Sequence, residues 1–96
     1  MKIKHQKKTL IQSKHNFSIT LDSLAQMQNN RDYKNIANLQ SKILEKFNND
    51  YKVLNLLGKA NKENGNLDKA IHFFNLSLRI NPNYIIALNN LGNIYN

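Results

Sequence analysis

The stretch that decides the fold is Tyr51-Lys52-Val53-Leu54-Asn55-Leu56-Leu57-Gly58, whose Leu-Gly ending recurs 34 residues later as Leu91-Gly92. Two further pairs of large apolar residues fall in the same register, Tyr51/Ile85 and Leu54/Leu88. A period of this length is typical of arrays of helical hairpins, because each hairpin buries its apolar face only against its neighbours. The period therefore predicts an all-α chain of stacked hairpins.

The clearest unit covers residues 51–84. Its first half places Leu54, Leu57 and the small Gly58 on one stripe, at the i, i+3, i+4 spacing of an amphipathic helix. Asn64-Gly65-Asn66 then predicts a turn, because glycine tolerates the positive φ that closes a helix. The sequence thus predicts a helix followed by a tight reversal.

A second helix is expected over residues 67–80. It ends at Asn81-Pro82, because proline lacks the amide hydrogen that a helix needs and disfavours helical geometry in the residue before it. A third helix is expected over residues 85–95. Asn66 and Asn83 precede these two helices and are expected to cap them.

These residues resemble the tetratricopeptide repeat, whose pattern is a large apolar residue, Leu-Gly, an aromatic, then later alanine, an aromatic and proline. The matching places are held by Leu54, Leu57-Gly58, Asn61, Ala70, Phe74 and Pro82. The next unit opens with Leu88, Leu91-Gly92 and Tyr95. Two residues depart from the pattern, since Asn61 stands where an aromatic is usual and Ser77 where alanine is usual. The resemblance implies a short right-handed solenoid of antiparallel hairpins, with about five helices.

Small side chains explain how such a hairpin closes. Gly58 and Ala70 let two antiparallel helices approach, and Phe74 fills the space beside them. A bulky residue at position 58 is expected to overpack the hairpin by about 1–3 kcal/mol. Phe73 is expected to make a packing contact between repeats.

The units on either side of residues 51–84 are less complete. Residues 17–50 form a degenerate repeat, with Asp32 as the expected cap in its turn. A third unit begins at residue 85 and holds one helix, which leaves uncovered the apolar residues Ile86, Leu91, Ile94 and Tyr95. The favoured interpretation is a fragment of a longer array, and the alternative is self-association through the helix of residues 85–96.

Composition narrows the function classes. The chain has 96 residues, a net charge of +8 and no cysteine, which excludes disulfides and thiolate metal sites. Residues 1–16 carry five lysines and no acid and predict a basic flexible tail, so that residues 17–96 form the repeat domain. No run of about 18 apolar residues could span a membrane. We therefore expect a cytoplasmic chain without a membrane span.

The resemblance implies a curved array whose inner wall is formed by the first helix of each repeat. In the second repeat, four polar residues fall within an arc of about 80° on that helix, namely Lys52, Asn55, Lys59 and Lys62. The equivalent positions are Ser18, Leu21, Ala25 and Gln28 in the first unit and Ile86, Asn89, Asn93 and Asn96 in the third. Asn90 resembles a rung of the asparagine ladder in O-linked N-acetylglucosamine transferases.

The predicted partner-binding groove therefore comprises Lys52, Asn55, Lys59, Lys62, Asn89, Asn90 and Asn93. Lysines suit acidic side chains or a terminal carboxylate. Asparagine amides suit an extended peptide, since they donate to and accept from one backbone unit. The alternative for the lysines is a solvated helix face.

Catalysis is not predicted for this chain. His5, His15 and His72 are isolated, the six acids are scattered, and no phosphate-binding glycine loop or G-x-S-x-G motif is present. We expect no catalytic residue, cofactor or metal.

The favoured function is a protein-interaction scaffold that binds a peptide, an acidic one included, or a partner protein. One alternative is an N-terminal recruiting or dimerising arm of a larger glycosyltransferase- or sulfotransferase-like enzyme. A further alternative is a basic helical domain that binds nucleic acid, which is less favoured because no aromatic residue lies among the lysines of the tail.

Overall fold

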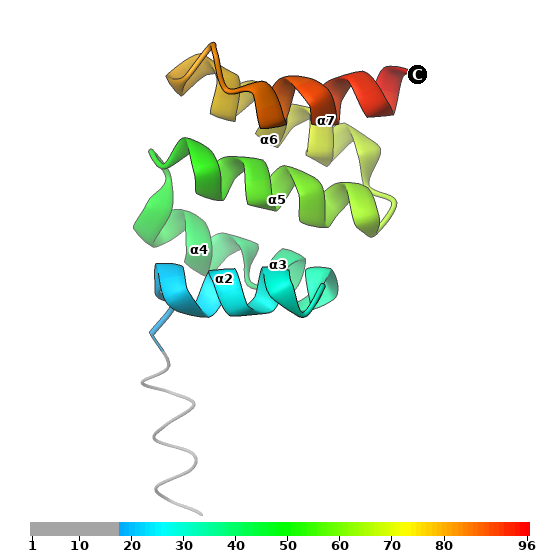
Figure 1. Ribbon diagram of the computed structural model, residues 1–96. Coiled ribbons are helices and arrows are strands. Elements are labelled where there is room, and N and C mark those ends of the chain that lie inside the picture. The colour runs from blue at the N-terminus through cyan, green and yellow to red at the C-terminus, as the bar shows by residue number, and fades with distance from the viewer. Residues whose placement is uncertain (1–17) are drawn as a thin grey trace, which may run out of the picture.

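Three helices in the same register lie one above another in the computed structural model, which describes residues 18–96 (Figure 1). They are α2 (Leu21–Asn29), α5 (Tyr51–Glu63) and α7 (Ile85–Tyr95). Behind them in this view lie α3 (Tyr33–Asn38), α4 (Gln40–Phe47) and α6 (Leu67–Ile80). The described residues hold no strand, and the predicted all-α stack of hairpins is confirmed. The predicted basic tail, residues 1–16, lies outside the described residues.

The second helix of the first unit is divided in two. Leu39, with φ −92° and ψ 7°, separates α3 from α4, and its amide donates to both Asn35 O at 3.0 Å and Ile36 O at 3.2 Å. The hydrogen-bonded path nevertheless continues, because Ile43 N donates to Leu39 O at 2.9 Å. Residues 18–96 therefore contain six helical segments, where about five helices were predicted.

The turns within the first two hairpins close in the same way. The turn after α5 has Gly65 at φ +83°, as the sequence predicted, and the turn after α2 has Arg31 at φ +54°, one 34-residue period earlier. In each turn the next residue donates back over five positions, Asn66 N to Asn61 O and Asp32 N to Met27 O, both at 2.8 Å. This is the Schellman closure of a helix end, which glycine adopts at low cost and arginine adopts against a steric penalty.

The caps differ in part from the predicted ones. Thr20 caps α2 through a reciprocal pair with Ser23, and Asp50 caps α5 by accepting from two backbone amides. Asp32 and Asn66 occupy N-cap positions, but neither side chain accepts a hydrogen bond from the backbone of its helix. Asn83 was wrongly predicted as the cap of the last helix: Tyr84 takes that place, and Asn83 N donates instead to Asn81 Oδ1 at 3.3 Å. Asparagines on both sides of Pro82 thus form a local turn before α7 begins.

The seam between α5 and α6 depends on Gly58. Phe74, fully buried, lies directly over this glycine, so that a Cβ built on Gly58 would approach Phe74 Cε1 to 2.5 Å. Ala70 is also fully buried one turn before Phe74. The small-against-large arrangement predicted for the hairpin is therefore present.

The two departures from the repeat pattern are both buried polar residues with hydrogen bonds. Ser77 is 0% exposed and donates to Tyr51 O at 2.7 Å, which ties α6 to the start of α5. Asn61 is 1% exposed and donates to Leu57 O at 2.8 Å and to Gln40 Oε1 at 3.1 Å. Asn61 therefore replaces the usual aromatic by a polar link from α5 to α4.

A shared core joins the first hairpin to the second. Ile36 and Ile43 from the first unit and Leu57 from the second are fully buried in one cluster, which also includes Phe73 at 4% exposure. Phe73 thus makes the contact between repeats that the sequence predicted.

Two alanine substitutions form a matched test of the α5–α6 seam. Gly58→Ala and Gly92→Ala both fill a helical glycine and gain the same helix propensity, up to about 1 kcal/mol. A Cβ at Gly92 meets no atom within 4 Å among the described residues, whereas one at Gly58 overlaps the Phe74 ring. We expect the free energy of unfolding of Gly58→Ala to be about 1–3 kcal/mol lower than that of Gly92→Ala, as measured by urea titration at low protein concentration. Equal midpoints would contradict the seam.

Candidate functional site on the face of α2, α5 and α7

A groove of about 260 Å³ lies between α2 and α5. Its apolar lining consists of Leu21, Leu24, Ala25, Val53 and Leu56, and its polar lining of Gln28, Asp50 and Lys52. Leu24, Val53 and Leu56 are buried, while Leu21 is 54% exposed at the rim. The groove thus offers an apolar floor whose polar edge carries one cation, Lys52, and one anion, Asp50.

The groove contains residues that sequence reasoning placed on this face and others that it missed. Lys52 was predicted, and Leu21, Ala25 and Gln28 were the equivalent positions in the first unit. Leu24, Val53 and Leu56 were missed as site residues, because an apolar residue at helical spacing indicates a core position equally well. The floor is formed by α2 and α5 together, so these residues could be recognised only by aligning the first two units with each other.

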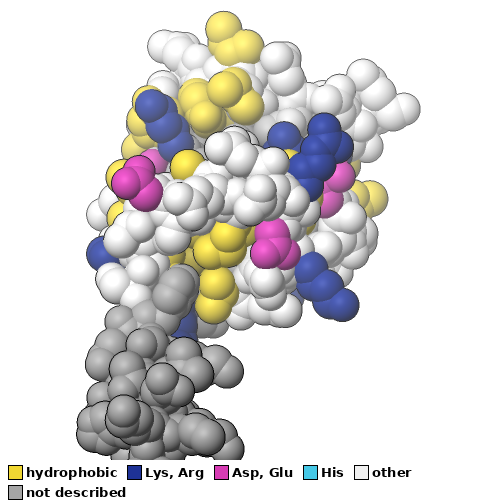
Figure 2. Space-filling model, turned by 60° about the horizontal axis from the view of Figure 1, so that its bottom comes forward, with side chains coloured by type: hydrophobic (Ala, Val, Ile, Leu, Met, Phe, Trp, Pro, Cys, Tyr) yellow, Lys and Arg dark blue, Asp and Glu magenta, His cyan; other side chains and the backbone are white. Residues whose placement is uncertain are grey.

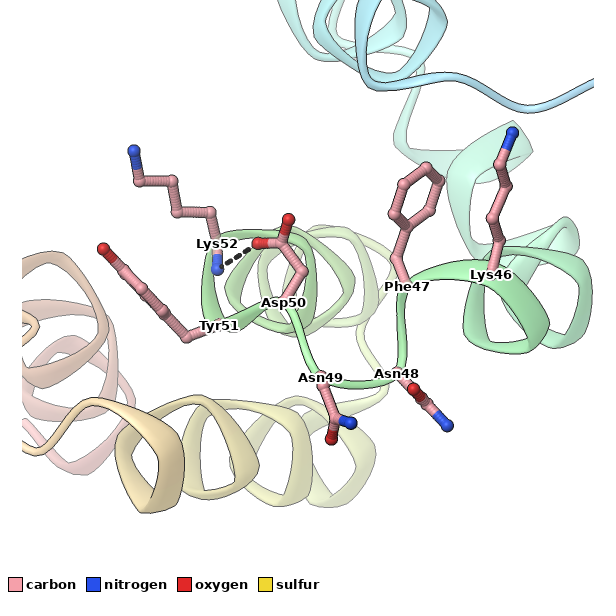
Figure 3. Close-up of a pocket in the computed structure, with 7 residues that line it drawn as sticks. All are labelled: Lys46, Phe47, Asn48, Asn49, Asp50, Tyr51 and Lys52. Atoms are coloured by element: carbon pink, nitrogen blue, oxygen red, sulfur yellow. Dashed lines mark hydrogen bonds between the residues drawn. The ribbon is translucent and has the colours of Figure 1, made fainter.

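Asp50 shapes the end of the groove through its capping role. Its Oδ1 accepts from Lys52 N at 3.0 Å and from Val53 N at 3.2 Å, so the carboxylate stays at the start of α5 (Figure 3). The backbone around it encloses an open, largely polar hollow of about 630 Å³, lined by residues 46–52. In Figure 3 the side chain of Lys46 extends away from Asp50, and its Nζ donates to Ile19 O at 2.9 Å. The hollow was not predicted from the sequence.

The three predicted lysines occupy different environments on α5. Lys52 is exposed, whereas Lys59 and Lys62 are half-buried. The Lys59 ammonium lies 5.7 Å from the centre of the Tyr33 ring, within the range of a cation–π contact. Among these three lysines, Lys52 is therefore the one most available to a partner.

Asn55 does not share the exposure of its stripe neighbours. It is 6% exposed, and its Oδ1 accepts from Asn90 Nδ2 at 3.0 Å. The predicted groove residues Asn55 and Asn90 are thus brought together as a polar bridge between α5 and α7, which the sequence did not predict. Asn89 and Asn93, also predicted, are exposed on α7.

Tyr51 and Tyr84 make a second link between these units. Their rings meet edge to face with centroids 4.8 Å apart. Burial raises the pKa of the Tyr84 phenol above its ordinary value, and the neighbouring Tyr51 and Asp50 raise it further. The phenol therefore favours its neutral form at this position.

Charges of both signs are dispersed over the face seen in Figure 2, where acidic side chains lie among the lysines and arginines. Residues 18–96 carry nine Lys and Arg against six Asp and Glu. Within this part of the chain, no cluster of three or more His, Asp or Glu is placed to bind a metal ion. None of the helices there has the length and hydrophobicity needed to cross a membrane.

The stacked hairpins and the groove between their first helices define a helical-repeat protein. Residues 51–84, the unit that carries the Gly58–Phe74 seam, match the family described as tetratricopeptide repeat.

The chain is also similar to the uncharacterized protein ycf37 of Pyropia yezoensis, with 49% identity over 41 residues. The match covers 43% of this chain and 23% of that relative, so the chain aligns with less than a quarter of its length. No solved structure matches the chain.

A double-mutant cycle tests the bridge between α5 and α7. We expect Asn55→Ala and Asn90→Ala each to lower the free energy of unfolding, and the double variant to lose less than the sum of both. The expected coupling is about 0.5–1.5 kcal/mol, the net contribution of one protein hydrogen bond. Strictly additive losses in urea unfolding would show that the bridge does not form.

The Tyr84 phenol gives a pH-dependent test. Its folded pKa exceeds the unfolded value of about 10, so its contribution to stability is complete below about pH 10 and is lost as pH rises through the folded pKa. As the pH rises above about 10, the free energy of unfolding should therefore fall less in Tyr84→Phe than in the parent. Tyr95→Phe, which alters a 69% exposed side chain, is the control and should follow the parent.

Proposed function

We propose that this chain is a protein-interaction module that binds a peptide segment of its partner along the face of α2, α5 and α7. The observation that carries the proposal is the groove between α2 and α5, whose apolar floor adjoins the exposed Lys52. A tetratricopeptide repeat over residues 51–84 supports a role in protein interaction in general. The residues that line the groove indicate which side chains such a peptide would carry.

The groove favours a peptide with an aliphatic side chain followed by an acidic group. Leu24, Val53 and Leu56 provide an apolar floor that excludes water from such a side chain. Lys52 at the rim attracts a carboxylate, and rim charges act chiefly on specificity and on the association rate. The exposed amides of Asn89 and Asn93 further along the face suit the peptide backbone.

Nucleic acid is the weaker candidate for this face. Of the three lysines predicted for it, Lys52 alone is exposed, and Lys59 and Lys62 are half-buried. Salt dependence distinguishes the two ligands, because duplex binding weakens by about 0.9 log units per phosphate contact for each log unit of salt. Capture of a peptide through one or two charge contacts should give a much shallower slope.

Two matched pairs of variants test the groove with fluorescein-labelled peptides that carry leucine flanked by glutamates. Lys52→Glu reverses the charge at the rim, and Lys69→Glu makes the same change at an exposed position on α6. Leu21→Ser removes a 54% exposed leucine from the groove, and Leu67→Ser removes a 47% exposed leucine from α6.

We expect Lys52→Glu and Leu21→Ser to weaken binding about three- to tenfold in fluorescence anisotropy, whereas both controls retain it. Equal losses in groove and control variants would contradict the proposed site. Nucleic acid would be favoured instead if duplex DNA bound more tightly than every peptide of the set and if that binding weakened steeply with salt.

A further inference from the structure

The chain has a single Asn-Gly pair, Asn64-Gly65, and this pair lies in the exposed turn between α5 and α6. Asparagine is a thermolabile residue, and before glycine it is especially reactive. The backbone nitrogen of the glycine can attack the side-chain carbonyl carbon of the asparagine. Because glycine lacks a Cβ, nothing hinders that approach, and its backbone turns freely into the geometry required. The sequence therefore places a chemically reactive pair at the end of α5.

The reaction of this pair needs only water. The Gly65 nitrogen forms a bond to Cγ of Asn64 while the bond from Cγ to Nδ2 breaks. Ammonia leaves with the proton of the Gly65 amide, and a five-membered succinimide ring remains. Water then opens the ring at one of its two carbonyl carbons, which leaves aspartate or isoaspartate at position 64. The net reaction converts an amide and a water molecule into a carboxylic acid and ammonia.

Three features of the folded turn oppose this reaction. Asn64 has ψ 3°, which places the Gly65 nitrogen beside the backbone nitrogen of Asn64 and away from Cβ, where the ring would close. The Gly65 amide donates its proton to Lys62 O, with an N···O distance of 3.0 Å. The side chain is held as well, because Asn64 Nδ2 donates to Tyr33 O at 3.1 Å. The turn must therefore open before the ring can form.

The last of these restraints comes from the first hairpin. Tyr33 begins α3, and the centre of its ring lies 5.7 Å from the Lys59 ammonium of α5. Tyr33 thus contacts the second hairpin twice, through its carbonyl oxygen and through its ring. While the two hairpins are docked, the side chain of Asn64 is held by this contact, and local opening of the contact releases it.

The turn of the first hairpin supplies a matched comparison within the same molecule. Asn30 stands one 34-residue period before Asn64, with φ −85° and ψ 1° against φ −87° and ψ 3°. The amide after Asn30 is bonded in the same way, Arg31 N to Gln28 O at 3.0 Å. The next residue differs, since arginine follows Asn30 and glycine follows Asn64. The backbone geometry of the two turns therefore cannot account for a difference in their reactivity.

Deamidation reverses the role of position 64 in the contact between the hairpins. The nitrogen that donates to Tyr33 O is lost, and a carboxylate, which can only accept, faces that carbonyl oxygen in its place. The new negative charge also lies at the C-terminal end of α5, where the helix dipole disfavours it. Isoaspartate in addition lengthens the backbone within the turn. The modified chain therefore holds its two hairpins together less firmly.

We propose that Asn64 is a site of spontaneous deamidation, that docking of the first hairpin onto α5 controls its rate, and that the product weakens this docking. A chain that has opened thus keeps a covalent record of the event and opens more readily afterwards. The inference does not rest on the peptide-binding function proposed above, although the groove between α2 and α5 has one wall in each hairpin and loosens with the contact.

Mass spectrometry of proteolytic peptides measures the modification at both asparagines in one sample. In the chain unfolded in guanidinium chloride, Asn64 should deamidate much faster than Asn30, because only Asn64 precedes glycine. In the folded chain the rate at Asn64 should fall about tenfold or more, since few molecules are open at any time. Equal rates at the two asparagines in the unfolded chain would overturn the site, and equal rates at Asn64 in the folded and unfolded chains would overturn its protection.

Two tyrosine substitutions test whether docking controls the rate. Tyr33→Ala removes the ring that Lys59 faces and should raise the rate at Asn64 in the folded chain about two- to fivefold, the effect of one exposed cation–π contact. Tyr95→Ala removes a 69% exposed tyrosine from α7 and should leave the rate unchanged. The same acceleration in both variants would overturn control by docking.

Gln40→Ala gives a second measurement at the same interface, because it removes the acceptor that Asn61 finds on α4. It should accelerate the reaction at Asn64 in the same direction as Tyr33→Ala, and it takes the place of that variant if Tyr33→Ala does not fold. Rates equal to that of the parent in variants with native circular dichroism would show that the turn opens without undocking, which overturns the proposed control.

The effect of the product is measured with Asn64→Asp and Asn30→Asp, which add the same charge at the same place in two turns. Both charges oppose a helix dipole, and position 64 in addition faces the Tyr33 carbonyl. Asn64→Asp should therefore lower the folding equilibrium constant about two- to tenfold more than Asn30→Asp in guanidinium unfolding. Equal losses would overturn the weakening of the contact by the product.

Discussion

The close approach of α5 to α6 at Gly58 is the constraint on which the rest of the structure depends. Because no Cβ stands at this position, the Phe74 ring lies against the backbone of α5 and is fully buried. The remaining faces of α5 then receive the first hairpin on one side and α7 on the other. Helix α5 is thus the centre of the stack, and eight of its thirteen residues are buried.

Buried polar groups fix the register of this packing. Ser77 donates to the carbonyl of Tyr51, and Asn61 donates to the carbonyl of Leu57 and to Gln40. A shift of α6 along α5 would break the bond from Ser77 to Tyr51, and a shift of α4 along α5 would break the bond from Asn61 to Gln40. Leaving a buried polar group without a partner costs more than the hydrogen bond itself contributes. Apolar contacts alone tolerate such sliding, so the amide and the hydroxyl make one arrangement preferable to its neighbours.

How much of this could be predicted depends on whether a residue acts within one hairpin or between hairpins. The 34-residue period, Gly58 and Phe74 together predicted the α5–α6 seam, because they act within one hairpin. The division of a helix at Leu39 and the capping position of α7, Tyr84 in place of Asn83, were not predicted, because the local sequence favours several competing turns. On the candidate site, Lys52 is exposed where expected, whereas the burial of Asn55 depends on Asn90, 35 residues away.

The repeat also explains why α7 carries an apolar and a polar face. Successive units present the same face in the same orientation, so the stripe that α6 covers on α5 recurs uncovered on α7. On α7 this stripe lies about 100° around the helix from the polar positions Asn89 and Asn93, which point along the proposed peptide site.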